Sequence, residues 1–160
     1  MKNKIQEIIK HLGMIPHPEG GFYKETYRSE ELCVNGKRNL KTVIYFLLRS
    51  EDVSHFHRIK SDEIWYFHAG SPLIVHSIDK YGNYIQQKLG TNFSNKELPQ
   101  YLVPKDTIFG STVLEENNYS LVSCSVSPGF DFDDFELFKQ NELIEKYPEH
   151  IEIITKLTLP

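Results

Sequence analysis

Two histidines and a carboxylate near the middle of the chain have types and spacing that could do chemistry. His55 and His57 stand two residues apart, and Glu63 follows shortly after them. Neutral imidazoles and a carboxylate can hold a transition metal such as zinc or iron, or they can accept and donate a proton. The structural alternative is one exposed histidine and one hydrogen-bonded histidine in the core. The spacing leaves these two interpretations equally open.

Strand alternation predicts how these residues meet. Residues i and i+2 of a strand point to the same face, so His55 and His57 share one face of a first strand. A turn at 60–62 leads into a second strand, and pairing of the two strands sets Glu63 opposite His57 and Trp65 opposite His55. The Cβ atoms of such partners lie roughly 5 Å apart. We therefore expect two imidazoles, a carboxylate and an indole on one patch.

A second group of polar side chains alternates along an earlier run. Tyr23, Glu25 and Tyr27 fall on one face of a strand predicted over residues 22–28. Such a face could line a pocket in which a tyrosine acts as acid and the glutamate as base. An ordinary surface strand with polar side chains explains the pattern equally well.

The elements that must position these residues are mostly short strands. Apolar residues at helical spacing predict a helix over 3–12, and two short helices are expected at 142–147 and from 148 to about 157. Frequent turn residues separate the runs between them, which is typical of an all-β sandwich or barrel. The predicted strands cover residues 22–28, 42–49, 53–59, 63–69, 73–79, 84–89, 101–103, 109–115 and 119–126.

Composition narrows the class of protein. The chain has 160 residues and a net charge of −4 with no basic block, which argues against a nucleic-acid or anionic-membrane partner. Cys33 and Cys124 lie far apart and form no CxxC pair, as expected of free thiols in a reducing cytosol. No apolar run approaches the ~20 residues that span a bilayer, and the N-terminus does not read as a signal peptide. We expect one cytoplasmic domain over residues 1–160.

Several stretches of the chain resemble a known protein family. The HxH…E…G pattern is similar to the first motif of the cupins, G-x5-H-x-H-x3–4-E-x6-G, although five residues separate His57 from Glu63 here. Longer stretches resemble the fifth cupin family, a domain of unknown function, over nearly the whole chain. They are HPEGGFYKETYRS at 17–29, FHRIKSDEIWYFHAG at 56–70, VPKDTIFGS at 103–111 and SPGFDFDDFEL at 127–137.

The resemblance implies a cupin jelly-roll β-barrel with a pocket inside it, commonly as a homodimer, and a structural likeness to dTDP-sugar epimerases. The positions of His57 and Glu63 are typical of this family, whereas that of His55 varies. The second cupin motif, PxG-x2-H, would begin at Pro104, and this chain has Phe109 where the histidine would be. The fourth metal ligand of a metal-dependent cupin is therefore missing.

Three functional hypotheses follow, and whether the protein is an enzyme stays open among them. The first is a metal-independent epimerase or isomerase acting on a small polar metabolite, such as a sugar or nucleotide-sugar. His57 would be the base, Glu63 would orient it, and Tyr23 or Tyr27 would be the acid. The second is a metal-dependent cupin in which His55, His57 and Glu63 form a weak site for a divalent transition metal, with water completing the coordination.

The third hypothesis is a non-catalytic module that binds a small molecule in an aromatic pocket. The fold by itself does not decide between this module and the two enzymes, because cupins host many chemistries. The residues expected to contact a ligand are His55, Glu25, Trp65, Phe67, Phe109 and Phe130.

Overall fold

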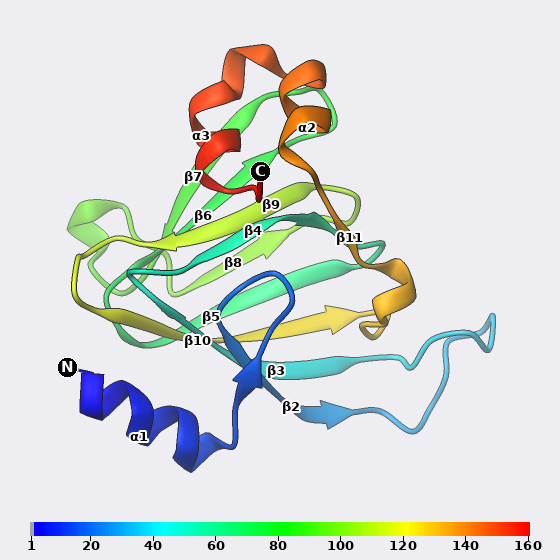
Figure 1. The fold of residues 1–160 in the computed structure, drawn as a ribbon. Helices are drawn as coiled ribbons and strands as arrows, with labels where there is room; N and C mark the ends of the chain where they lie inside the picture. The colour runs from blue at the N-terminus through cyan, green and yellow to red at the C-terminus, as the bar shows by residue number, and fades with distance from the viewer. Residues whose placement is uncertain (1) are drawn as a thin grey trace.

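Two antiparallel sheets face each other and enclose the core (Figure 1). The structure is a computed structural model that describes residues 2–160. In sheet order, the six-stranded sheet consists of β1 (Ile15–Pro16), β2 (Phe22–Arg28), β3 (Thr42–Arg49), β10 (Tyr119–Ser127), β5 (Asp62–Gly70) and β8 (Gln100–Val103). The five-stranded sheet consists of β11 (Glu136–Leu137), β4 (Val53–Arg58), β9 (Ile108–Val113), β6 (Leu73–Ile78) and β7 (Tyr84–Leu89). The predicted all-β jelly-roll barrel is confirmed.

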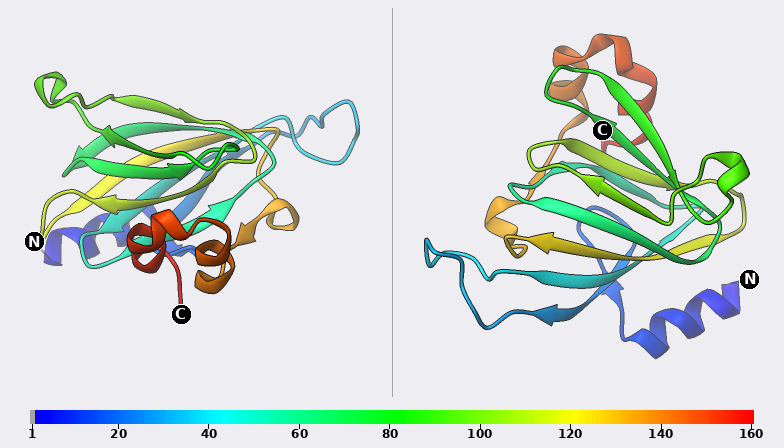
Figure 2. Two further views of the ribbon diagram at one scale, coloured as in Figure 1. Left: turned by 90° about the horizontal axis from the view of Figure 1, so that it is seen from above. Right: turned by 180° about the vertical axis from the view of Figure 1, so that it is seen from behind.

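Helices cover the outer faces of the barrel (Figure 2). The predicted N-terminal helix is confirmed as α1 (Lys2–Leu12), which buries Ile5 against Leu47 and Tyr119 on the outside of the six-stranded sheet. At the C-terminus, α2 (Gln140–Lys146), the 3-10 turn η3 (Pro148–His150) and α3 (Ile151–Lys156) pack on the outside of the five-stranded sheet. Two further 3-10 turns are η1 (Phe93–Asn95) and η2 (Phe132–Asp134). No helix within residues 2–160 is long and apolar enough to cross a membrane.

The apolar run of β3 reflects burial on both of its faces. Phe46 and Leu48 point into the barrel and belong to the core cluster that also contains Trp65 and Phe109. Leu47 points the other way, beneath α1. Because alternate residues of a strand point to opposite faces, a strand covered on both sides loses the polar half of its pattern. This explains why 42–49 is the most apolar stretch of the chain.

The hairpin predicted between 53–59 and 63–69 is wrong. β4 pairs with β9 and β11, whereas β5 pairs with β10 and β8, so the two strands belong to different sheets. The short connection between them carries the chain from one sheet to the other. His57 and Glu63 therefore reach the interior from opposing sheets instead of lying side by side on one patch.

The predicted common face of His55 and His57 is also wrong. The register of β4 against β9 shifts between Ser54 and His57, which marks a bulge. As a result the side chains of Ser54 and His57, three residues apart, both reach Glu19 inside the barrel. His55 lies outside this pair, and its ring Nδ1 contacts the backbone oxygen of Glu19 at 2.7 Å.

Candidate functional site

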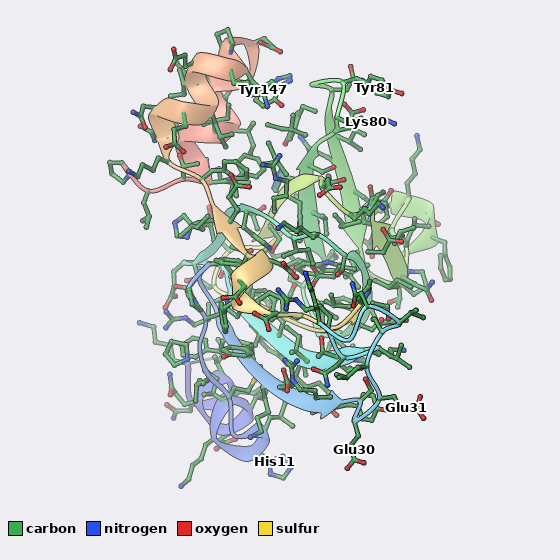
Figure 3. All side chains as sticks on the ribbon, turned by 90° about the vertical axis from the view of Figure 1, so that its right-hand side faces the viewer. His11, Glu30, Glu31, Lys80, Tyr81 and Tyr147 are labelled. Carbon is green, nitrogen blue, oxygen red and sulfur yellow. The ribbon has the colours of Figure 1, made fainter. Side chains whose placement is uncertain are left out.

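A cavity of about 440 Å³ lies inside the barrel. Its walls come from β2, β3, β4, β5 and β10, together with the loops around residues 17–19 and 130–132. Exposed charged residues such as Glu30, Glu31 and Lys80 project outward from the body of the protein (Figure 3). Four titratable side chains of the cavity are instead buried, those of His17, Glu19, His57 and Glu63, and burial changes their proton affinities.

A tight turn presents Glu19 to this cavity. The backbone of His17 bonds across it, donating to the oxygen of Gly21 at 2.9 Å and accepting from the nitrogen of Gly20 at 3.0 Å. Gly20 has a φ of +110°, and a Cβ there would collide with the carbonyl of Val53. Only glycine fits such a position. No role was predicted for His17 or Glu19, although an acid followed by two glycines is a signal of close backbone approach.

Glu19 and His57 share one proton. His57 Nδ1 lies 2.7 Å from the backbone oxygen of His55, which can only accept, so Nδ1 carries a proton. His57 Nε2 lies 3.1 Å from Glu19 Oε2, and this contact needs a second proton between the two atoms. Burial lowers the pKa of His57 to about 4 and raises the pKa of Glu19. Both shifts favour a neutral pair in which the Glu19 carboxyl donates to Nε2, while Glu19 Oε1 accepts from the Ser54 hydroxyl at 3.0 Å.

His17 completes this group without a hydrogen bond to the carboxyl. Its Nδ1 accepts from the backbone nitrogen of Glu19 at 3.1 Å, so that atom carries no proton. The same Nδ1 lies 3.6 Å from Glu19 Oε2, which is too long for a hydrogen bond. Burial lowers the pKa of His17, so its ring is neutral and places its proton on Nε2.

Glu63 is a protonated acid at neutral pH. Burial raises the pKa of Glu63 to about 8, and any negative charge that develops on nearby Glu19 opposes the ionisation of Glu63 further. The side chain of Glu63 bonds to the thiol of Cys124, whose pKa is raised by its own burial and by Glu63. The carboxyl that contacts His57 is therefore Glu19, where the sequence analysis expected Glu63 to orient the ring.

Aromatic rings form the apolar part of the cavity and support the polar part. Trp65 and Phe130 line the cavity, whereas Phe67 packs against the core beside it. Phe109 lies behind the lining, with its ring centroid 4.2 Å from that of His57 and 6.2 Å from that of Trp65. The residue that replaces the histidine of the second cupin motif thus holds two rings of the site in place.

The two tyrosines predicted to share a face are separated. Tyr23 lines the cavity, with its ring centroid 4.6 Å from that of His17. Tyr27 is 52% exposed and lies outside the cavity. The register of β2 against β3 shifts between Glu25 and Tyr27, and this bulge changes the alternation.

The cavity lining also contains the ion pair of Arg28 with Glu25, and Asp131 near it. Arg28 binds the Glu25 carboxylate through two nitrogens, at 2.9 and 2.8 Å. Its remaining contacts are to the backbone oxygen of Phe130 at 3.0 Å and to Asn39 Oδ1 at 2.9 Å. All three guanidinium nitrogens of Arg28 are therefore occupied by partners within the protein.

The donors do not form a metal site. The Nδ1 atoms of His55 and His57 both contact backbone oxygens, His57 Nε2 contacts Glu19, and His55 does not line the cavity. Among residues 2–160, no group of three or more His, Cys, Asp or Glu side chains is arranged to hold a metal ion. In this arrangement these residues do not fit a metal site.

Comparisons with known proteins agree with the architecture. The model of a family described as Cupin superfamily (DUF985) matches residues 6–138. The uncharacterized protein YML079W of Saccharomyces cerevisiae is 32% identical over 154 residues, with 86% of this chain and 76% of that protein covered. Protein SO0799 from Shewanella oneidensis has a TM-score of 0.92 and 48% identity, and the match covers 97% of each chain.

Two further solved structures differ in how much they share with this chain. A hypothetical protein from Leishmania major has a TM-score of 0.91 and 43% identity, covering 97% of this chain and 98% of that chain. An oxalate decarboxylase of Bacillus subtilis has a TM-score of 0.59 and 16% identity, covering 89% of this chain and 36% of the other. At that identity the decarboxylase shares the fold alone.

Proposed function

The chain belongs to the family described as Cupin superfamily (DUF985), and from its cavity we propose that it is a proton-transfer enzyme, a metal-independent isomerase or epimerase acting on a small polar metabolite. The fold hosts many chemistries, so the proposal rests on the site. The observation that carries it is the contact of 3.1 Å between Glu19 Oε2 and His57 Nε2. These two buried atoms share one proton, and both can be protonated at once.

The pair acts as the base. When the Glu19 carboxyl passes its proton to His57 Nε2, the resulting carboxylate can take a proton from a substrate carbon next to a carbonyl group. Glu19 and His57 Nε2 are then both protonated, and the pair carries one positive charge. His57 stays oriented throughout, because its Nδ1 proton is bonded to the backbone oxygen of His55.

Glu63 supplies the acid. Its raised pKa keeps a proton on the carboxyl at neutral pH, and that proton can pass to the substrate carbonyl oxygen. The electron pair of the broken C–H bond becomes the C=C bond of an enol, and Glu63 becomes a carboxylate. Its negative charge is balanced by the positive charge now on the Glu19–His57 pair.

The carbon and the face to which a proton returns decide the product. Delivery to the opposite face of the same carbon gives an epimer, and delivery to the neighbouring carbon gives an isomer. Tyr23 lines the same cavity and is the candidate acid for the opposite face. Tyr27 is exposed and takes no part in this scheme.

Exchange of solvent deuterium tests the proposal without knowledge of the product. The protein is incubated in D₂O with D-glucose, D-mannose, D-fructose and dihydroxyacetone, and deuterium next to the carbonyl is followed by NMR. We expect exchange with at least one compound, reduced about 10²–10⁴-fold in Glu19→Gln and in Glu63→Gln. Glu30→Gln is the matched control, because Glu30 is exposed and outside the cavity.

The non-catalytic binding module is the second candidate, and the aromatic walls favour it. Trp65, Phe46 and Phe130 would hold a ligand by burial and stacking even without proton transfer. A compound that binds the cavity, yet shows no deuterium exchange above the rate without protein, would overturn the enzyme and leave the module.

A further inference from the structure

The charges around the cavity restrict what can enter it. Four carboxyl groups line it, those of Glu19, Glu25, Glu63 and Asp131. Besides two buried histidines whose pKa values are lowered, Arg28 is the cation among the lining residues that the structure describes. Two of these carboxyls, those of Glu19 and Glu63, are protonated. Arg28 is paired with Glu25 and lies near Asp131, so an anionic ligand would meet no surplus of positive charge.

The hydrogen bonds of Arg28 leave it one guanidinium N–H for an anion. Its nitrogens are engaged by Glu25, by Asn39 and by the backbone oxygen of Phe130. A phosphate that leaves water needs charge-assisted hydrogen bonds to replace its hydration. To obtain them here it would have to displace the Glu25 carboxylate from a two-bond contact.

The floor of the cavity suits uncharged hydroxyl and carbonyl groups. The Glu63 carboxyl can donate one hydrogen bond and accept others, and the Glu19 carboxyl is joined to His57 and Ser54. Tyr23, Trp65 and Phe130 add flat apolar surface on which a sugar ring can pack. A volume of about 440 Å³ lies near the lower end of the range for ligand pockets, which suits a single sugar ring.

We propose that the ligand of this cavity is a neutral monosaccharide, in ring or open-chain carbonyl form, and that phosphorylated and nucleotide-linked sugars are rejected. The inference rests on the proposed function and narrows its substrate class. Rejection follows from the pairing of Arg28 with Glu25, which leaves no surplus of positive charge among the lining residues.

Intrinsic fluorescence gives a direct binding assay, because the chain has one tryptophan and Trp65 lines the cavity. The protein is titrated with D-glucose, D-mannose, D-fructose and D-xylose, then with glucose 6-phosphate, mannose 6-phosphate, fructose 6-phosphate, UDP-glucose and glucosamine. Calorimetry confirms each titration. We expect saturable binding of at least one neutral sugar, at least 10-fold tighter than that of its phosphate counterpart.

A variant that frees Arg28 tests the reason for rejection. Glu25→Ala removes the carboxylate partner, so we expect the affinity for the sugar phosphate, relative to that for the neutral sugar in the same variant, to rise about 10-fold. Glu31→Ala is the control, because Glu31 is exposed and outside the cavity. An unchanged affinity of Glu25→Ala for phosphates would overturn this electrostatic account.

The outcomes separate this inference from the proposed function. Tighter binding of a phosphate, a nucleotide-sugar or glucosamine by the unaltered protein overturns the neutral substrate class, and so does the absence of binding by every neutral sugar. Deuterium exchange into a phosphosugar overturns it too, while leaving the proton-transfer function intact. A neutral sugar that binds without exchange supports the ligand class and contradicts the enzyme.

Discussion

The proton shared by Glu19 and His57 can be tested through the stability of the folded protein. Replacing Glu19 with alanine leaves the Ser54 hydroxyl and His57 Nε2 without the partners they have at 3.0 and 3.1 Å. A buried polar group that loses its partner costs about 1–3 kcal/mol. We expect Glu19→Ala to lower the free energy of unfolding by about 2–3 kcal/mol. This value lies at the low end of the summed cost for the two groups, because water can enter the cavity.

Glutamine at the same position should preserve both contacts. Its amide oxygen can accept from Ser54, and its amide nitrogen can donate to His57 Nε2, as the protonated carboxyl does. We therefore expect Glu19→Gln to cost less than about 1 kcal/mol, even though its deuterium exchange is lost. The difference between the two variants isolates the hydrogen bonds from the chemistry.

Urea denaturation at neutral pH measures both values, with Glu30→Ala as the exposed control. For a chain of this size, each kcal/mol corresponds to about 2–4 °C in melting temperature, so Glu19→Ala should melt about 4–12 °C lower. The reasoning is refuted if Glu19→Gln is as destabilising as Glu19→Ala. That result would mean that Glu19 is ionised and pairs with a protonated His57, since loss of a buried charge partner is costly whichever neutral residue replaces it.

Three further predictions follow from the same structure. The pKa of Glu63 is raised from 4.5 to about 8 in the folded protein. Between these two pH values the folded state binds more protons than the unfolded state. The stability that Glu63 contributes should therefore fall as the pH rises toward 8. The slope between pH 6.5 and 8 should be shallower in Glu63→Gln, and an unchanged urea titration series would contradict the assignment. Phe109→Ala should lower the free energy of unfolding by about 3–5 kcal/mol, measured by urea denaturation, because it removes a fully buried ring. Gly20→Ala should lower the melting temperature far more than Gly36→Ala. Both positions have a positive φ, but an added Cβ would meet atoms within 4 Å only at Gly20. Equal melting temperatures would show that the turn at 17–21 can move.

Bulges limited what alternation alone could predict about the site. The strand ranges 22–28 and 53–59 were close to those observed, yet each strand shifts register once, between Glu25 and Tyr27 in β2 and between Ser54 and His57 in β4. One extra residue moves every later side chain to the other face of a strand. This is why Tyr27 and His55 lie outside the cavity that Tyr23 and His57 line.

The partner of His57 was hidden for a different reason. Glu19 is 35 positions or more from the β4 residues it contacts, and it reaches them only because the turn at 17–21 folds into the barrel. Local propensity identifies that segment as a turn, but it carries no information about which strand the turn meets. The assignment of Glu63 as the orienting carboxyl was reasonable for a hairpin that the two sheets do not form.

The sequence by itself determined the all-β architecture, the helices at its ends and the family. These follow from local patterns: the spacing of apolar residues, the frequency of turns and the motifs at 17–29 and 56–70. Only the tertiary structure decided which sheet each strand joins, that Glu19 and not Glu63 contacts His57, and that both carboxyls are buried. The physical reason is that pairing and burial depend on contacts between distant residues, and burial in turn sets the proton affinities on which the proposed chemistry depends.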